Sequence, residues 1–261
     1  MLASNDLYPF AGTAKVLRSH DLRIGNLECV VSTLGSPLPK QYTFEAPLRA
    51  FDRLSAAGYH IVSVANNHSG DYGKAAFSDM LARLPGYGIT HVGGGANRTQ
   101  AHQPVIRTMR GTRIGLLAYC DIEPNSFAAT DTTPGHAWLD DVAMPQDIAA
   151  TRPLVDFLIV FTHWGQEYHL VENDLQRYLA HKAIDAGADL VVGAHPHVIE
   201  PSEMYHGKPI IYSLGNFVFD EMPGVDALGN VLSLTVKGSQ LLSWKLLPTR
   251  LGDDAAPVWI A

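Results

Sequence analysis

The sequence predicts an α/β or α+β layered domain, and three observations favour this fold class. Short apolar runs typical of buried strands alternate with stretches of helical periodicity along most of the chain. Several of these runs end directly in histidine or asparagine. The chain closes with two strand-like runs joined at Gly238-Ser239, which indicates an antiparallel hairpin. Together these patterns predict strands and helices that pack in layers.

The first half of the chain is expected to alternate strands and helices. The helix over residues 47–57 is closed by Gly58, because glycine readily adopts the left-handed conformation of a C-cap. Asp71 is expected to cap the next helix, in which apolar residues recur at i, i+3, i+4 and i+7 from Phe77. β-branched and apolar clusters predict strands over residues 21–31, 59–65, 91–95, 105–109 and 113–119.

The second half follows the same alternation after a long connection. Residues 121–145 contain proline and show no regular periodicity, so we expect a long irregular connection. Connections of this length are more often functional or mobile than purely structural. A helix is expected over residues 174–186, with Leu175, Tyr178, Leu179 and Ala183 on its apolar face. Strands are expected over residues 156–161, 189–192, 208–214, 230–237 and 241–247.

Composition restricts the classes of partner. The 261 residues are 46% apolar and 17% charged, which is ordinary for a chain that buries a sizeable core. The net charge of −7 argues against nucleic acid and anionic membrane surfaces as main partners. Two cysteines, Cys29 and Cys120, do not suggest a disulfide framework. We therefore expect no nucleic acid as a partner, and composition alone does not separate a small-molecule substrate from a polymer.

The strand-end residues are chemically suited to a metal centre. Asparagine, histidine and carboxylate ligands without cysteine suit Mn, Fe or Zn. Two such ions about 3.5–4 Å apart can activate water and clamp phosphoryl oxygens. A nearby histidine that is not a ligand could protonate a leaving group. His195 and His197 flank Pro196, and in an extended segment both imidazoles would address one metal pair.

Five motifs together resemble one known family. They are Asn26-Leu27-Glu28, Ala65-Asn66-Asn67-His68-Ser69-Gly70-Asp71-Tyr72-Gly73, His163-Trp164-Gly165-Gln166-Glu167-Tyr168, Gly193-Ala194-His195-Pro196-His197-Val198 and Tyr212-Ser213-Leu214-Gly215-Asn216-Phe217-Val218-Phe219-Asp220. The sequence resembles the CapA family of bacterial capsule and poly-γ-glutamate biosynthesis proteins. Their fold is similar to that of the calcineurin-like metallophosphoesterases, a β-sandwich flanked by helices. The resemblance implies a single metallophosphatase-like domain of this type over residues 1–261.

The resemblance also implies a role for each strand-end residue, with two divalent metal ions (Mn, Fe or Zn) as cofactors. Glu28 would be the carboxylate that bridges the ions. Asn67, His163 and His195 would hold one ion, and His197 would hold the other. His68 would be the catalytic histidine that binds no metal, and Asn66 replaces the glycine usual in the superfamily.

One departure from the family concerns the start of the sequence. The family opens with a strand that ends in Gly-Asp-x-Met-Leu, whose aspartate is a metal ligand. Met1-Leu2 fits the end of that motif. We therefore expect an N-terminally truncated domain in which the first strand is missing and the His197 ion lacks one charged ligand.

Other polar and aromatic residues in these motifs are expected to have supporting roles. Asp71, Glu167 and Asp220 are expected to position loops or cap helices rather than bind metal. Trp164 and Tyr168 are expected to form walls of the site.

The residues leave two functions open. The first is a phosphoesterase-type, metal-dependent hydrolase of capsule or poly-γ-glutamate biosynthesis. The second is a non-catalytic accessory or binding protein in polymer synthesis or export, with a degenerate metal site. A metal-dependent amidohydrolase is disfavoured by the Asn67-His68 pair. The resemblance implies contact with polymer-synthesis machinery. Family members are often anchored outside the cytoplasmic membrane, but the sequence leaves localisation open.

Overall fold

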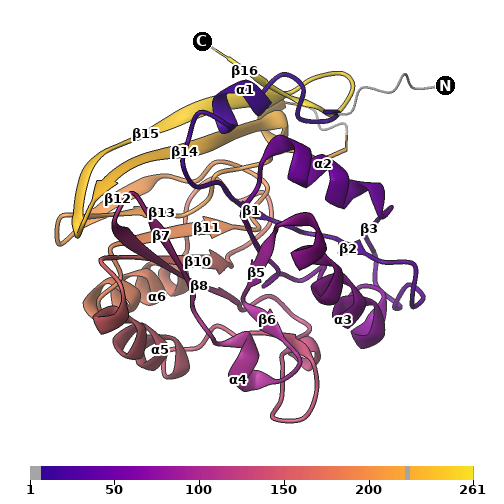
Figure 1. Cartoon of the computed structure of the whole chain (residues 1–261), viewed down its shortest axis with the longest axis horizontal. Coiled ribbons are helices and arrows are strands. Elements are labelled where there is room, and N and C mark those ends of the chain that lie inside the picture. The colour runs from indigo at the N-terminus through magenta and orange to yellow at the C-terminus, as the bar shows by residue number, and fades with distance from the viewer. Residues whose placement is uncertain (1–6, 221–223, 261) are drawn as a thin grey trace.

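The computed structural model describes residues 7–220 and 224–260, and a six-stranded mixed sheet lies at its centre (Figure 1). The strand order is β12-β13-β11-β10-β8-β7. The four inner strands run parallel, while β7 and β12 pair antiparallel at the two edges. The strands are β7 (Val105–Met109), β8 (Thr112–Cys120), β10 (Phe157–His163), β11 (Leu190–Ala194), β12 (Ser202–Tyr205) and β13 (Lys208–Ile211).

Successive side chains of the central strands point to opposite faces of the sheet, as the pleat of a strand requires. On β8, Leu117 and Tyr119 pack in the cluster that includes α5 (Ala143–Thr151) and α6 (Asp174–Asp185). Leu116 and Ala118 pack in a second cluster on the other face. Both faces of this sheet are therefore covered, which explains why its inner strands read as continuous apolar runs.

A second sheet covers the other face of the central one. It is parallel, with the order β1-β4-β5, and consists of β1 (Ile24–Asn26), β4 (Ile61–Ser63) and β5 (Thr90–Val92). Ile61 and Val92 share a core cluster with the central sheet. Val62 packs instead with α2 (Arg49–Ala57) and α3 (Gly73–Arg83). The chain therefore forms a β-sandwich flanked by helices, and the expected fold class is confirmed.

A C-terminal hairpin completes the cover over the central sheet. β14 (Leu228–Lys237) and β15 (Gln240–Leu251) carry Leu234 and Leu246 against the same cluster, and β16 (Pro257–Trp259) pairs with β15. In Figure 1 this hairpin lies on the opposite side of the central sheet from α5 and α6. The remaining elements are α1 (Ala14–Leu17), β2 (Val30–Val31), β3 (Glu45–Ala46), η1 (Leu84–Tyr87), β6 (Gly94–Gly95), α4 (Arg98–Ala101), η2 (Asn125–Phe127), β9 (Gly135–His136), η3 (Arg152–Leu154) and η4 (Gly224–Ala227).

Several local predictions were confirmed and others were wrong. Gly58 ends α2 with φ of 87°, as its C-cap position predicted. Asp71 does not cap α3, which begins at Gly73 without a side-chain cap. The apolar face predicted for α6 was wrong, since Leu175 and Tyr178 are exposed. Burial on α6 follows Gln176, Leu179, Ala180, Ala183 and Ile184 instead.

Two further observations concern the ends and the surface of the chain. Met1-Leu2, on which the expectation of a missing first strand rests, lie outside the described residues. Within residues 7–220 and 224–260, no helix is both long enough and apolar enough to cross a membrane.

Candidate metal centre

The carboxyl ends of parallel strands bring the predicted site residues together. β1 and β4 run parallel, as do β10 and β11, so the residues that follow them emerge at one edge of each sheet. The residues that follow these strands or end them are Glu28 after β1, Asn67 and His68 after β4, His163 at the end of β10, and His195 and His197 after β11. Sequence positions more than a hundred residues apart therefore meet around one space.

Contacts among these side chains define the centre of the cluster. His163 Nε2 lies 2.8 Å from Asn67 Oδ1 and 3.3 Å from Glu28 Oε1. His197 Nε2 lies 3.9 Å from the same Glu28 oxygen, and the rings of His163 and His195 are 5.0 Å apart. One carboxylate oxygen is thus shared between two histidines, as a bridging ligand would be.

The polar atoms of this cluster are not satisfied by the protein alone. Glu28 Oε1 is buried without a hydrogen-bond partner, and so are His163 Nδ1 and His195 Nδ1. Burying polar atoms without partners is costly, so buried groups are normally paired or bind metal. Ligand atoms of Glu28, His163 and His195 all lie within 4.8 Å of one another. These residues therefore fit a divalent cation.

The protonation states also fit a cation. Burial alone would raise the pKa of Glu28, but the neighbouring histidines, His163 foremost, outweigh it and lower the pKa to about 2. Burial, together with the charge on His163, lowers the pKa of His195 to about 3. At neutral pH the centre therefore offers an ionised carboxylate and a neutral imidazole, the forms that bind a divalent ion.

His68 lies beside this cluster in a different environment. Its Nδ1 lies 2.7 Å from Asp71 Oδ2, and its ring packs 4.3 Å from the ring of Phe44. The buried Asp71 also accepts bonds from Lys40 Nζ at 2.6 Å and from the backbone N–H of Phe44 at 2.8 Å. Asp71 thus positions a loop, which is one of the roles expected for it, and fixes the orientation of His68.

The predicted geometry of the His195-Pro196-His197 segment was wrong. Both histidines have left-handed backbone conformations, with φ of 100° and 59°, so the segment is a turn rather than an extended strand. The two rings nevertheless lie 6.0 Å apart. Such strained conformations persist where the surrounding structure fixes them, often at functional sites.

Three asparagines hold the predicted ligands in place, and the sequence did not assign them these roles. Asn216 is buried, and its Oδ1 lies 2.9 Å from His197 Nδ1 while its Nδ2 donates to the His197 carbonyl. This pairing leaves His197 Nε2 facing Glu28. Asn66 donates to Asn26 Oδ1, and Asn26 in turn donates to Glu28 Oε2 at 2.8 Å. The sequence shows these asparagines near the ends of strands, but which residue each of them contacts depends on the tertiary structure.

The loop after β10 brings two further residues to the cluster. Ligand atoms of Glu167, His195 and His197 lie within 4.8 Å of one another, although Glu167 is exposed. The Tyr168 ring lies 6.2 Å from that of His197, as expected for a wall of the site. Trp164 does not form such a wall, because it is fully buried in the core and donates to the Tyr212 carbonyl.

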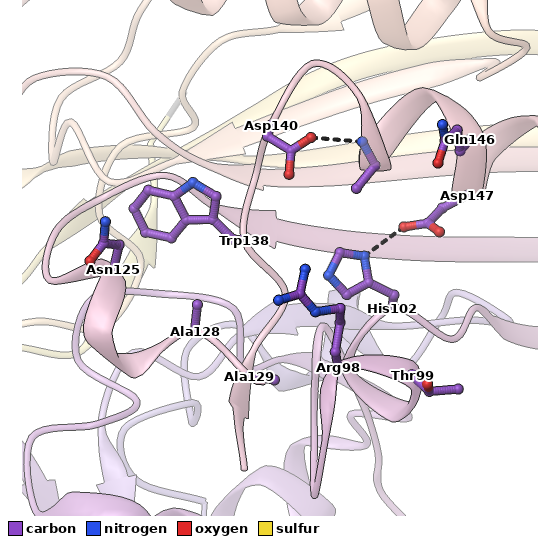
Figure 2. Close-up of a pocket in the computed structure, with 11 residues that line it drawn as sticks. Arg98, Thr99, His102, Asn125, Ala128, Ala129, Trp138, Asp140, Gln146 and Asp147 are labelled. Atoms are coloured by element: carbon purple, nitrogen blue, oxygen red, sulfur yellow. Dashed lines mark hydrogen bonds and ion pairs between the residues drawn. The ribbon is translucent and has the colours of Figure 1, made fainter. Parts of the chain in front are cut away.

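A separate cavity of about 450 Å³ lies between α4 and α5 (Figure 2). Its lining includes Arg98, Trp138 and His102, and His102 Nδ1 is 2.7 Å from Asp147 Oδ2. None of the predicted site residues lines this cavity. The histidine cluster and the cavity are therefore distinct features of the structure.

Comparisons with known sequences agree on one protein family. Residues 4–221 match the family model described as "Bacterial capsule synthesis protein PGA_cap". The chain is 35% identical over 209 residues to the PGA biosynthesis protein CapA of Bacillus subtilis (strain 168), covering 79% of this chain and 55% of the relative. It is 32% identical over 222 residues to the capsule biosynthesis protein CapA of Bacillus anthracis, covering 82% and 54%. The chain thus spans about half the length of these relatives.

Comparisons with solved structures show the same fold at low sequence identity. A hypothetical protein from Thermus thermophilus aligns with a TM-score of 0.61 and 15% identity, covering 93% of this chain and 91% of that one. A 5'-nucleotidase precursor from the same organism aligns with a TM-score of 0.50 and 17% identity, covering 81% and 42%. These similarities identify a metallophosphatase-like fold.

Proposed function

The chain belongs to the PGA_cap family of bacterial capsule synthesis proteins, and from this we propose that it is a metal-dependent phosphoester hydrolase of capsule or poly-glutamate biosynthesis. One observation carries the proposal. Glu28 Oε1 is buried and accepts no hydrogen bond of regular geometry, although His163 Nε2 lies 3.3 Å and His197 Nε2 lies 3.9 Å from it. A cation next to this oxygen would satisfy it.

Each predicted ligand has a place in a two-ion arrangement. Asn67, His163 and His195 would hold one ion, His197 would hold the other, and Glu28 would be shared. Bound divalent ions would supply Lewis-acid polarisation of a phosphoryl oxygen and a lowered pKa for an attacking water. Asn216 orients His197, and the Asn66–Asn26 pair orients Glu28, as supporting residues do around metal ligands.

His68 is the proposed proton donor to the leaving oxygen. Asp71 holds the Nδ1 proton of His68, so Nε2 is left to carry the proton that is transferred. Phe44 packs on the ring and limits the access of water. General acid catalysis of this kind contributes about 10²–10⁴-fold to a rate.

The proposed substrate is a small molecule or a polymer that carries a phosphate ester or diester. The names of the relatives place those proteins in capsule and poly-glutamate synthesis, so we propose contact with polymer-synthesis machinery. The net charge of −7 disfavours nucleic acid as a partner.

Metal binding and turnover in matched variants test this function. Protein loaded with Mn²⁺ or Zn²⁺ is assayed on p-nitrophenyl phosphate and bis(p-nitrophenyl) phosphate. Turnover should require metal and should be lost in His163→Asn. His181→Asn removes a histidine that pairs with Glu203 outside the cluster, and should leave turnover unchanged. Two bound ions without turnover of either ester would contradict the hydrolase and leave the accessory, binding role.

A further inference from the structure

We propose that Glu167 is a ligand of the ion held by His197, which makes the loop after β10 part of the metal centre. This inference rests on the proposed metal centre and adds a residue that the sequence assigned to loop positioning. The observation behind it is the convergence of Glu167, His195 and His197, whose ligand atoms lie within 4.8 Å of one another.

This spacing is close to that of a shared ion. Ligand atoms bound to one Zn²⁺ at about 2.0–2.2 Å lie about 3.4 Å apart in a tetrahedral site, and at most about 4.4 Å apart on opposite sides of the ion. An approach of about an ångström by the exposed Glu167 side chain would bring its carboxylate into coordination. His197 Nδ1 lies 2.9 Å from Asn216 Oδ1, so His197 Nε2 is the ring nitrogen available for a cation on this side of the cluster.

The backbone holds Glu167 over the two histidines. The N–H of Tyr168 donates to the carbonyl of Pro196 at 2.8 Å, which ties the residue after Glu167 to the proline between His195 and His197. Tyr168 has a left-handed φ of 64°, so the loop is bent at this contact. The position of Glu167 therefore follows from a main-chain bond and not only from a flexible side chain.

The start of the loop is fixed as well. Gly165 has φ of 88°, and a Cβ at this position would lie 2.5 Å from Gln176 Nε2. Gln176 forms the capping box of α6 with Asn173 and donates to the buried Glu200. The loop from His163 to Tyr168 is thus anchored at both ends, and this keeps Glu167 near the cluster.

Charge gives a reason for a second carboxylate. Two divalent ions carry four positive charges, whereas Glu28 is the only acidic residue among the ligands predicted from the sequence. The histidines and Asn67 would bind as neutral groups. Glu167 adds a negative charge on the His197 side.

Metal binding by the full chain tests the proposal without reference to turnover. Calorimetric titration with Mn²⁺ should give two ions per wild-type chain. Glu167→Gln should keep the first ion at wild-type affinity and bind the second at least tenfold more weakly, since losing even a residue that only supports a metal ligand costs about 10–100-fold in affinity. In electron paramagnetic resonance, the coupled two-manganese signal of the wild type should give way to that of isolated Mn²⁺. Asp174→Asn removes a carboxylate that is fully exposed, and should change neither readout.

The outcomes separate this inference from the proposed function. Two ions bound to Glu167→Gln at wild-type affinities would overturn the role of Glu167 and leave the metal centre intact. An equal loss in Asp174→Asn would also overturn it, because the effect would then reflect overall charge. No metal on folded wild-type protein would overturn both proposals.

Discussion

Asp71→Asn probes the coupling between His68 and the fold. The Asp71 carboxylate is fully buried and accepts from Lys40 at 2.6 Å, from His68 at 2.7 Å and from the Phe44 N–H at 2.8 Å. An asparagine keeps one acceptor oxygen and places an NH₂ donor against Lys40 or His68. Losing one hydrogen bond to a charged group costs about 1.5–3 kcal/mol. We expect the free energy of unfolding, measured by urea denaturation, to fall by that amount.

The same substitution should change the dependence of hydrolysis on the leaving group. Without the Asp71 carboxylate, the orientation of the His68 ring is no longer fixed. Because general acids contribute about 10²–10⁴-fold, we expect kcat to fall about 10–100-fold for an alkyl phosphodiester. A p-nitrophenyl ester, whose leaving group needs little protonation, should lose only about threefold.

Asp79→Asn is the matched control for this experiment. Asp79 accepts from Ser32 and Arg83 outside the site. Its replacement should alter stability without any dependence on the leaving group. Equal slowing of both esters by Asp71→Asn, or no slowing of either, would refute the proposed role of His68.

Three further predictions concern pH, packing and metal. Burial raises the pKa of Glu200 to about 7 from an ordinary value of 4.5, so the folded state retains a proton that the unfolded state releases as pH rises. The free energy of unfolding of the wild type, measured in urea, should therefore fall by about 1–3 kcal/mol relative to that of Glu200→Gln between pH 5 and pH 8. A difference between the two proteins that stays constant with pH would refute this. A Cβ at Gly193 would lie 2.0 Å from the Tyr212 carbonyl oxygen and 2.4 Å from Trp164 Nε1. Gly193→Ala should therefore lower the free energy of unfolding by about 1–3 kcal/mol. A variant as stable as the wild type would contradict the packing described. Mn²⁺ at about a hundred times its dissociation constant should raise the free energy of unfolding by about 2.7 kcal/mol per site and EDTA should reverse this, whereas a melting temperature indifferent to both would argue against specific binding.

The sequence predicted the layers and most of the strand ends because those signals are local. Apolar runs that end in His163 or in Ala65-Asn66-Asn67-His68 show both the burial of a strand and the point where it leaves the core. Because the strands pair in parallel, their carboxyl ends lie at the same edge of the sheet, so the position of the site follows from the strand ends alone. The roles of individual residues as metal ligands stay predictions, as does the extent of a single domain over residues 1–261.

The details that sequence reasoning missed depend on contacts distant in the chain. Asn216 acts on His197 only because β13 and the turn after it fold back beside β11. The apolar face of α6 was misassigned because Gln176, a polar residue, is buried by its bonds to Asn173 and Glu200. Left-handed conformations at His195 were unforeseen because non-glycine residues seldom adopt them.

Anomalous X-ray diffraction from crystals grown with Mn²⁺ or Zn²⁺ tests the central claim most directly, because it locates ions without assuming a reaction. The account predicts two anomalous peaks on either side of the Glu28 carboxylate, one in contact with Asn67 and His163 and the other in contact with His197. Folded protein with no peak among these residues, or with peaks only at surface side chains, would contradict it.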